Sequence, residues 1–112
     1  MFNPSNAFQG EEHQPFQFDG NNGRAVLLTH GFPGSAAEMR PVGALFHKRG
    51  WTSRGVLLPG FGPAIETLPE KSMDDWLDAV MRAYSDLRRT HDTVVVAGNS
   101  MGGALSIQAA AQ

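Results

Sequence analysis

The 112-residue sequence contains no cysteine, and this absence excludes several kinds of chemistry. Disulfide bonds, thiolate metal ligands and a cysteine nucleophile cannot occur without the thiol group. Long apolar runs are missing too, since none approaches the roughly 18 residues of a membrane-spanning helix. Residues 1–20 lack the basic and apolar regions of a signal peptide. We therefore expect a cytoplasmic protein without a transmembrane segment.

The sequence also has no strong excess of positive or negative charge. Charged residues make up 18% of the sequence, the formal net charge is -2, and the basic residues do not cluster. Nucleic acids and anionic membrane surfaces select for basic patches. The sequence therefore predicts no nucleic-acid partner, and its charge implies no cofactor.

The most informative stretch that is present runs through residues 93–103. Residues 93–97 are a short β-branched apolar run and residues 101–111 are rich in alanine, so we expect a strand, a sharp turn and a helix. At the turn, Gly98, Ser100 and Gly102 match G-x-S-x-G. This pattern is typical of a nucleophile elbow, in which the serine hydroxyl is exposed at the carboxyl edge of a sheet.

The two elbow glycines would have a steric role. A side chain at Gly98 or Gly102 would clash where strand and helix meet, and a strained backbone at Ser100 needs small neighbours. The pattern thus predicts Ser100 as a catalytic nucleophile. The alternative is a Gly/Ser turn in an ordinary βα unit, because five residues alone are a weak signal.

A second motif upstream favours the nucleophile. Residues 25–29 are apolar, as expected for a strand covered on both faces, and residues 30–34 follow with His-Gly-Phe-Pro-Gly. Acyl transfer needs backbone N–H donors for the developing oxyanion, and a glycine-flanked loop can supply one. We predict an oxyanion hole formed by the N–H groups of Phe32 and Met101, with Gly31 as the loop glycine.

Other interpretations of the histidines and of this loop stay open. Pro33 and Gly34 could merely punctuate a strand-to-helix turn. His30 could be a general base, but its loop position favours a structural histidine whose ring shapes the loop. His91 lies at the amino end of a strand, opposite to where ligands bind in parallel sheets.

Hydrophobic periodicity and turn residues predict the remaining elements. A strand at 16–18 is joined by a tight turn to the strand at 25–29, and a capping box S-x-x-E follows at 35–38. The later elements are a helix at 40–49, a strand at 51–58, a loop at 64–71 and a helix from Ser72. The end of the strand at 51–58 should border the site. The alternation predicts an α/β fold with a mainly parallel sheet and flanking helices.

Together, these motifs make the sequence resemble the α/β-hydrolase superfamily. Within this superfamily, the sequence resembles the carboxylesterase and monoacylglycerol-lipase-like group. The resembling segments are 30–34, 40–41, 49–51, 58–62, 74–76 and 98–103. The resemblance implies the N-terminal half of an α/β-hydrolase fold, with residues 1–14 as a flexible lead-in and 15–112 as an incomplete domain. Phe61 departs from the pattern, since many relatives have histidine there.

By this resemblance, Ser100 would attack a small-molecule ester, and the Phe32 and Met101 amides would hold the oxyanion. A histidine and an acid from a missing C-terminal half would complete the triad, with no metal or organic cofactor. The 112 residues alone should then have little esterase activity. The alternatives are a non-catalytic hydrolase-like module that binds a small apolar ligand, and a thioesterase, amidase or perhydrolase on the same fold.

Overall fold

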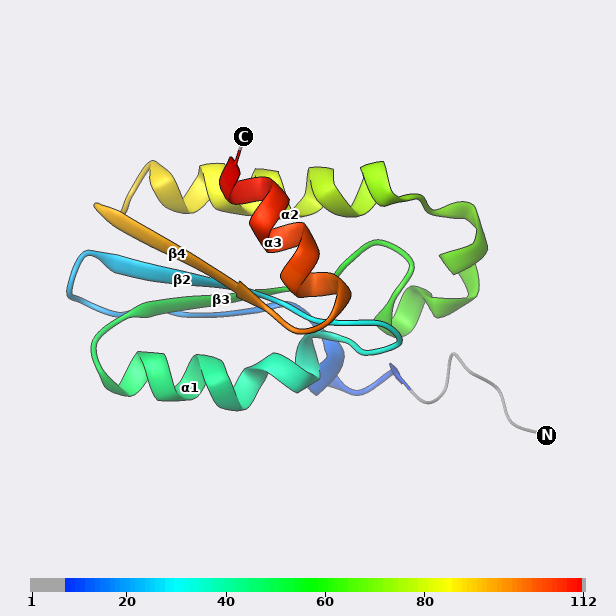
Figure 1. Ribbon diagram of the computed structural model, residues 1–112. Helices are drawn as coiled ribbons and strands as arrows, with labels where there is room; N and C mark the ends of the chain where they lie inside the picture. The colour runs from blue at the N-terminus through cyan, green and yellow to red at the C-terminus, as the bar shows by residue number, and fades with distance from the viewer. Residues whose placement is uncertain (1–7, 112) are drawn as a thin grey trace.

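The computed structural model in Figure 1 describes residues 8–111. These residues contain four strands and three α-helices, together with 3-10 segments before the first strand, before the first α-helix and before the second α-helix. The strands are β1 (Phe16–Phe18), β2 (Arg24–Thr29), β3 (Thr52–Val56) and β4 (Thr93–Gly98); the helices are α1 (Arg40–Lys48), α2 (Met73–Arg88) and α3 (Met101–Ala111); the 3-10 segments are η2 (Glu11–His13), η3 (Ala36–Met39) and η4 (Gly62–Glu70).

The strands form one sheet in the order β1-β3-β2-β4. Strand β2 pairs in parallel with both β3 and β4, while β1 is antiparallel to β3. Helices α1 and α2 connect the parallel strands, which is the crossover that parallel pairing requires. The predicted α/β fold with a mainly parallel sheet is confirmed.

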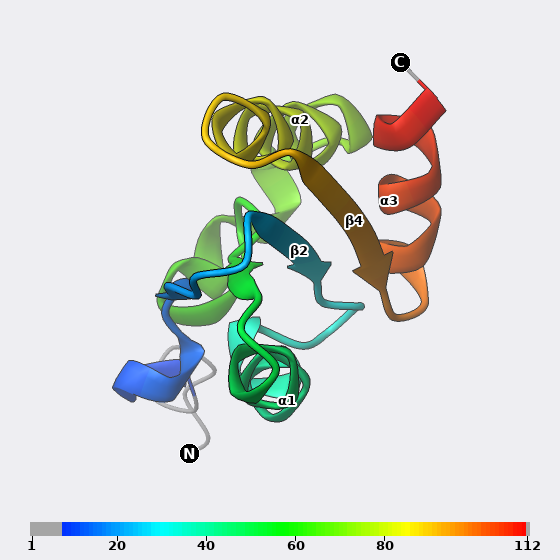
Figure 2. The ribbon, with the colours of Figure 1, turned by 90° about the vertical axis from the view of Figure 1, so that its left-hand side faces the viewer.

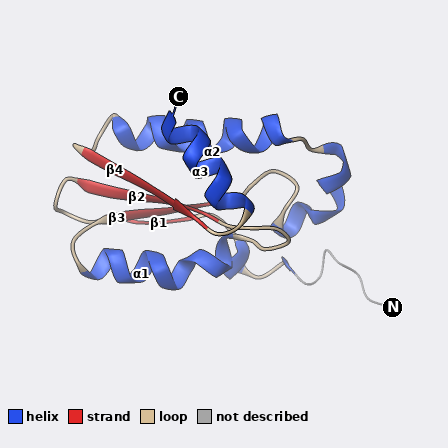
Figure 3. Cartoon of the chain, viewed as in Figure 1, coloured by secondary structure: helices blue, strands red, loops and turns tan. Residues whose placement is uncertain are grey.

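Helices cover both faces of this sheet. Helix α1 lies on one face, and α2 and α3 lie on the other (Figures 2 and 3). Because strand side chains alternate between faces, Ala25 and Leu27 of β2 pack in the α2/α3 core, and Val26 and Leu28 pack in the α1 core. All four are fully buried, which explains why this strand is apolar without alternation.

The position of β1 differs from the expected strand-turn-strand unit. Strand β1 pairs with β3 and not with β2, which follows it in the sequence. Two glycines make room for the Phe16 ring: a Cβ placed on Gly55 would lie 2.0 Å from Phe16 Cε1, and one on Gly43 would lie 2.6 Å from Phe16 Cε2. The ring therefore packs against β3 and α1, which fixes β1 at that edge.

The connection to α2 also departs from expectation. The sequence predicts a loop at 64–71, but most of these residues belong to the 3-10 segment η4. A capping box then starts α2, because Ser72 Oγ accepts from the Asp75 N–H and Asp75 Oδ2 accepts from the Ser72 N–H. Trp76 Nε1 donates to the Pro59 carbonyl at 2.8 Å, which ties α2 to the loop after β3.

Residues 1–7 of the expected lead-in lie outside the described residues. The described part is hydrogen-bonded to the start of α1. Arg40 donates to the backbone carbonyls of Glu11, Glu12 and Gln14 at 2.8 to 3.2 Å. His13 Nδ1 also lies 2.7 Å from Ser35 Oγ. This segment therefore packs beside the loop that follows β2.

Across residues 8–111, none of the helices combines the length and apolarity needed to cross a membrane. The same residues contain no group of three or more His, Cys, Asp or Glu side chains placed to hold a metal ion.

Candidate active site

Ser100 lies at the turn between β4 and α3. Its φ is 56°, in the left-handed region that residues other than glycine rarely adopt, and it is exposed. Its carbonyl accepts hydrogen bonds from the N–H groups of Gly103 and Ala104, so the strained residue is held by the first turn of α3. Strained backbone of this kind persists where the surrounding structure fixes it, and it concentrates at functional sites.

The two predicted elbow glycines lie at close backbone contacts. A Cβ on Gly102 would lie 2.2 Å from the Thr29 carbonyl oxygen and 2.4 Å from that of His30. A Cβ on Gly98 would lie 2.3 Å from the carbonyl carbon of Gly102. The start of α3 thus packs directly on the end of β2 at Gly102 and on the end of β4 at Gly98, and a side chain at either glycine would open its contact.

The loop after β2 touches the elbow. A Cβ on Gly31 would lie 2.8 Å from the Asn99 carbonyl oxygen and 3.1 Å from Ser100 Cβ. The Asn99 N–H also donates to the Thr29 carbonyl at 3.2 Å, which continues the β2–β4 pairing to the turn. The structure therefore brings the two sequence motifs together at the carboxyl ends of neighbouring strands, where ligands bind in parallel sheets.

The peptide between Gly31 and Phe32 has a defined orientation. The Gly31 carbonyl accepts from the Gly34 N–H at 2.8 Å and from His30 Nδ1 at 3.0 Å. Since N–H and C=O point in opposite directions across a trans peptide, the Phe32 N–H points away from both donors. Within residues 8–111, neither the Phe32 N–H nor the Met101 N–H donates a hydrogen bond to another protein group.

His30 supports this loop from the interior of the protein. Its ring is buried, Nδ1 donates to the Gly31 carbonyl, and Nε2 accepts from the Leu58 N–H at 3.0 Å. Only the neutral imidazole with its proton on Nδ1 satisfies both bonds. Burial accordingly lowers the pKa of His30, although the Gly31 carbonyl and Glu38 oppose this effect. Both ring nitrogens are occupied, which disfavours a general-base role.

The loop after β3 borders the same region. Phe61 is fully buried and lies edge-on against His30 and Phe32, with ring centroids 5.1 and 5.8 Å away. The Phe32 ring is 59% exposed. An apolar side chain of the loop after β2, the loop that touches the elbow through Gly31, therefore reaches solvent.

Glu38 occupies a position that the sequence did not indicate. The S-x-x-E pattern predicts that Glu38 caps its own helical turn, and only Ser35 does so, by accepting from the Ala37 N–H. The Glu38 carboxylate instead accepts from the Gly31 N–H at 2.6 Å and from Asn99 Nδ2 at 3.1 Å. It therefore joins the loop after β2 to the elbow, which a local pattern cannot reveal.

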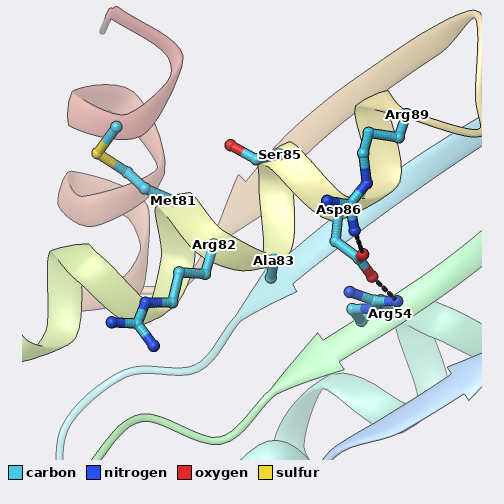
Figure 4. A pocket seen from close by; sticks show the side chains of 7 residues that line it. All are labelled: Arg54, Met81, Arg82, Ala83, Ser85, Asp86 and Arg89. Atoms are coloured by element: carbon cyan, nitrogen blue, oxygen red, sulfur yellow. Dashed lines mark hydrogen bonds and ion pairs between the residues drawn. The ribbon is translucent and has the colours of Figure 1, made fainter.

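A hollow of about 560 Å³ lies elsewhere, between α2 and β3 (Figure 4). Its charges are paired: Asp86 forms ion pairs with Arg54, at 2.8 Å, and with Arg89. The Arg54 guanidinium, which hydrogen-bonds to Asp86, lowers the pKa of that carboxyl. Ser100 does not line this hollow, so it is not part of the candidate active site.

A serine on a left-handed strand-to-helix turn, with a glycine loop from the adjacent parallel strand against it, is the backbone arrangement typical of a nucleophile elbow. Comparison with known families agrees, because the model of the "Alpha/beta hydrolase family" matches residues 26–111. The chain belongs to the α/β hydrolase family.

Individual relatives lie within the group that the sequence resembles. The chain is 34% identical over 96 residues to a carboxylesterase of Bacillus subtilis (strain 168), covering 85% of the chain and 39% of that protein. It is 35% identical over 94 residues to a thermostable monoacylglycerol lipase of Bacillus sp. (strain H-257), covering 84% of the chain and 37% of that protein.

A solved structure gives the same result. It was described under "LipS and LipT, two metagenome-derived lipolytic enzymes", and it superimposes with a TM-score of 0.83 at 31% identity. The match covers 89% of this chain and 40% of that chain. The resemblance to carboxylesterases and monoacylglycerol lipases is therefore confirmed, and the chain spans less than half the length of these relatives.

Proposed function

We propose that this chain carries the nucleophile and the oxyanion-binding groups of a serine hydrolase that cleaves carboxylic esters. The observation that carries the proposal is the contact between the loop after β2 and the elbow, where a Cβ on Gly31 would lie 3.1 Å from Ser100 Cβ. Because Phe32 directly follows Gly31, this contact supports an oxyanion donor at Phe32 for a nucleophile at Ser100, which is exposed. The esterase and lipase relatives support ester substrates.

In this proposal a catalytic base takes the proton of the Ser100 hydroxyl as its oxygen attacks the ester carbonyl and forms a tetrahedral intermediate. The N–H groups of Phe32 and Met101 donate to its oxyanion. Collapse of the intermediate breaks the bond to the alcohol, which leaves with the proton that the base returns, and the acyl group stays on Ser100. Water then attacks the acyl-enzyme, releases the carboxylic acid and restores the serine. These steps require no metal or organic cofactor.

The reaction also needs a base for Ser100 and a group that orients the base. Among the described residues, no histidine hydrogen-bonds to Ser100. We place the catalytic histidine and acid in a C-terminal half that follows Gln112 in the whole protein. Residues 1–112 by themselves should then turn over esters slowly, because a serine without its base is a weak nucleophile.

The test is the Ser100→Ala variant of the whole protein with nitrophenyl esters of increasing acyl length. We expect kcat to fall by about 10⁴-fold or more, as when a catalytic serine is removed from other serine hydrolases. Ser85→Ala is the matched control, because Ser85 is exposed on α2. The wild type should also be labelled at Ser100 by a fluorophosphonate. A folded wild type that neither hydrolyses esters nor reacts with the probe would favour a non-catalytic binding module.

A further inference from the structure

We propose that Glu38 is a positioning residue that fixes the loop after β2 against the nucleophile elbow, and so sets the separation of the two oxyanion donors. The proposal rests on the proposed function, because it concerns how the Phe32 and Met101 amides are held. Glu38 itself does not touch the reacting atoms.

The hydrogen bonds of the carboxylate carry this inference. One oxygen accepts from the Gly31 N–H at 2.6 Å, and the other accepts from Asn99 Nδ2 at 3.1 Å. Gly31 immediately precedes Phe32, and Asn99 immediately precedes Ser100. A single rigid carboxylate thus bridges the two chain segments that supply the donors and the nucleophile.

The turn is built closely around this carboxylate. A Cβ on Gly34 would lie 2.5 Å from Glu38 Oε1 and 3.1 Å from Glu38 Cδ. The Gly34 N–H meanwhile donates to the Gly31 carbonyl. The absence of a side chain at Gly34 therefore leaves space for the Glu38 carboxylate. The Gly34 N–H also closes the turn that contains Phe32.

The bridge should affect catalysis more than stability. Glu38 and Asn99 are both exposed, and exposed charged groups contribute little to the free energy of folding. Oxyanion donors act only at short, well-aligned distances, and a displacement of about 1 Å in an active site can cost about 100-fold in rate. Loss of the bridge should therefore reduce kcat in a protein that still folds.

Positioning can be separated from a simple charge effect. A carboxylate near a developing oxyanion disfavours it, so a charge effect alone predicts that both Glu38→Gln and Glu38→Ala maintain or raise the rate. Under the positioning role, the side chain introduced by Glu38→Gln keeps an oxygen that accepts from the Gly31 N–H. Its amide can also pair with Asn99 after the Asn99 amide rotates. Glu38→Gln should then rescue the function that Glu38→Ala loses.

The experiment uses the whole protein with Glu38→Ala, Glu38→Gln and the control Glu70→Ala, whose side chain is also exposed. A nitrophenyl ester gives kcat and KM, and a trifluoromethyl ketone, which forms a charged adduct on the serine, reports on the oxyanion hole. For Glu38→Ala we expect kcat and ketone affinity to fall about tenfold or more, with KM within about twofold. Glu38→Gln and Glu70→Ala should stay within about threefold of the wild type.

A second pair of variants tests the bridge from its other end. Asn99→Asp places two carboxylates against each other and should reproduce the Glu38→Ala defect. In the double variant with Glu38→Gln, the amide is at position 38 and the carboxylate at position 99, so the hydrogen bond can form in the opposite direction. Its activity should recover to within about threefold of the wild type. The inference is overturned if Glu38→Ala matches Glu70→Ala in kcat and ketone affinity, or if the double variant is no better than Asn99→Asp.

Failure of this inference can be distinguished from failure of the proposed function. If the wild type shows neither esterase activity nor fluorophosphonate labelling, the proposed function is wrong. The hydrogen bond from the Gly31 N–H to Glu38 can still be tested by amide hydrogen exchange. The exchange rate of the Gly31 N–H should be about tenfold higher in Glu38→Ala than in Glu70→Ala. Equal exchange rates would refute the bridge independently of any activity.

Discussion

Strands β2 and β4 are similar in sequence and differ in their surroundings. Both are short and apolar, and they pair residue by residue, with Val26 opposite Val95. Strand β2 has a neighbour on each side and Val26 is 0% exposed, whereas within the described residues β4 pairs only with β2 and Val95 is 41% exposed. Burial here is set by neighbouring elements and not by composition.

The candidate site joins the ends of these two unlike strands. The loop of residues 30–34 follows β2. The buried His30 ring fixes it through hydrogen bonds to the Gly31 carbonyl and the Leu58 N–H. The elbow continues from the edge strand, where an apolar hollow of about 420 Å³ lies between β4 and α3 and Ile107 is 73% exposed. Among the described residues, the start of α3 packs on the end of β2 through Gly102.

Gly102→Ala should break this packing and have the largest effect. The new methyl group would overlap the backbone carbonyls of Thr29 and His30, which cannot move without disturbing the strand. We expect loss of folded protein or a destabilisation of about 3 kcal/mol or more, measured by urea unfolding. Gly103→Ala is the control, because its new Cβ would lie 3.3 Å from the Gly98 carbonyl oxygen and alanine favours the helix. Similar stability of the two variants would contradict the packing argument.

A matched pair of truncations sharpens the comparison between the strands. Val26→Ala removes two methyl groups from a closed core and should lower the free energy of unfolding by about 2 kcal/mol. Val95→Ala removes the same atoms from the edge strand and should cost less than about 1 kcal/mol. Chemical denaturation of both variants measures the difference. Equal losses would show that β4 is as enclosed as β2.

The smallest effect is expected from pH and concerns the β2 end alone. Because burial lowers the pKa of His30 below 6.5, the unfolded chain binds this proton more readily than the folded protein. The stabilising contribution of neutral His30 is complete above about pH 6.5 and decreases as the pH falls towards the folded pKa, by at most about 1.4 kcal/mol per pH unit. NMR titration of the His30 ring checks the direction. A midpoint at or above 6.5 would contradict the neutral, doubly bonded ring.

The parts of the fold that depend on local signals were predictable from the sequence. The helix expected at 40–49 is α1 (Arg40–Lys48), and the strand expected at 93–97 is β4 (Thr93–Gly98). The glycine spacing around Ser100 predicts a tight turn, and the structure has a positive φ there. Periodicity and turn chemistry act over a few residues, so a sequence displays them directly.

Features that depend on distant partners were not predictable. Strand β1 pairs with β3 because Gly43 and Gly55 accommodate Phe16, and neither glycine lies near Phe16 in the sequence. Glu38 reaches Asn99, 61 positions away, although its local pattern suggested a cap. Such contacts are decided by tertiary packing, which outweighs local preference. The roles of Ser100, Phe32 and Met101 themselves stay predictions that the proposed variants and probes test.

The Gly31 carbonyl accepts two hydrogen bonds, from the Gly34 N–H and from His30 Nδ1, and this affects the expected time course of the proposed reaction. Rotating the peptide that joins Gly31 to Phe32 would sacrifice two hydrogen bonds at once, so its N–H keeps one direction whether or not substrate is present. If the Phe32 and Met101 amides bind the oxyanion as proposed, an N–H that already points in this direction needs no rearrangement when the ester binds. Acylation should then begin without a lag when enzyme and ester are mixed rapidly.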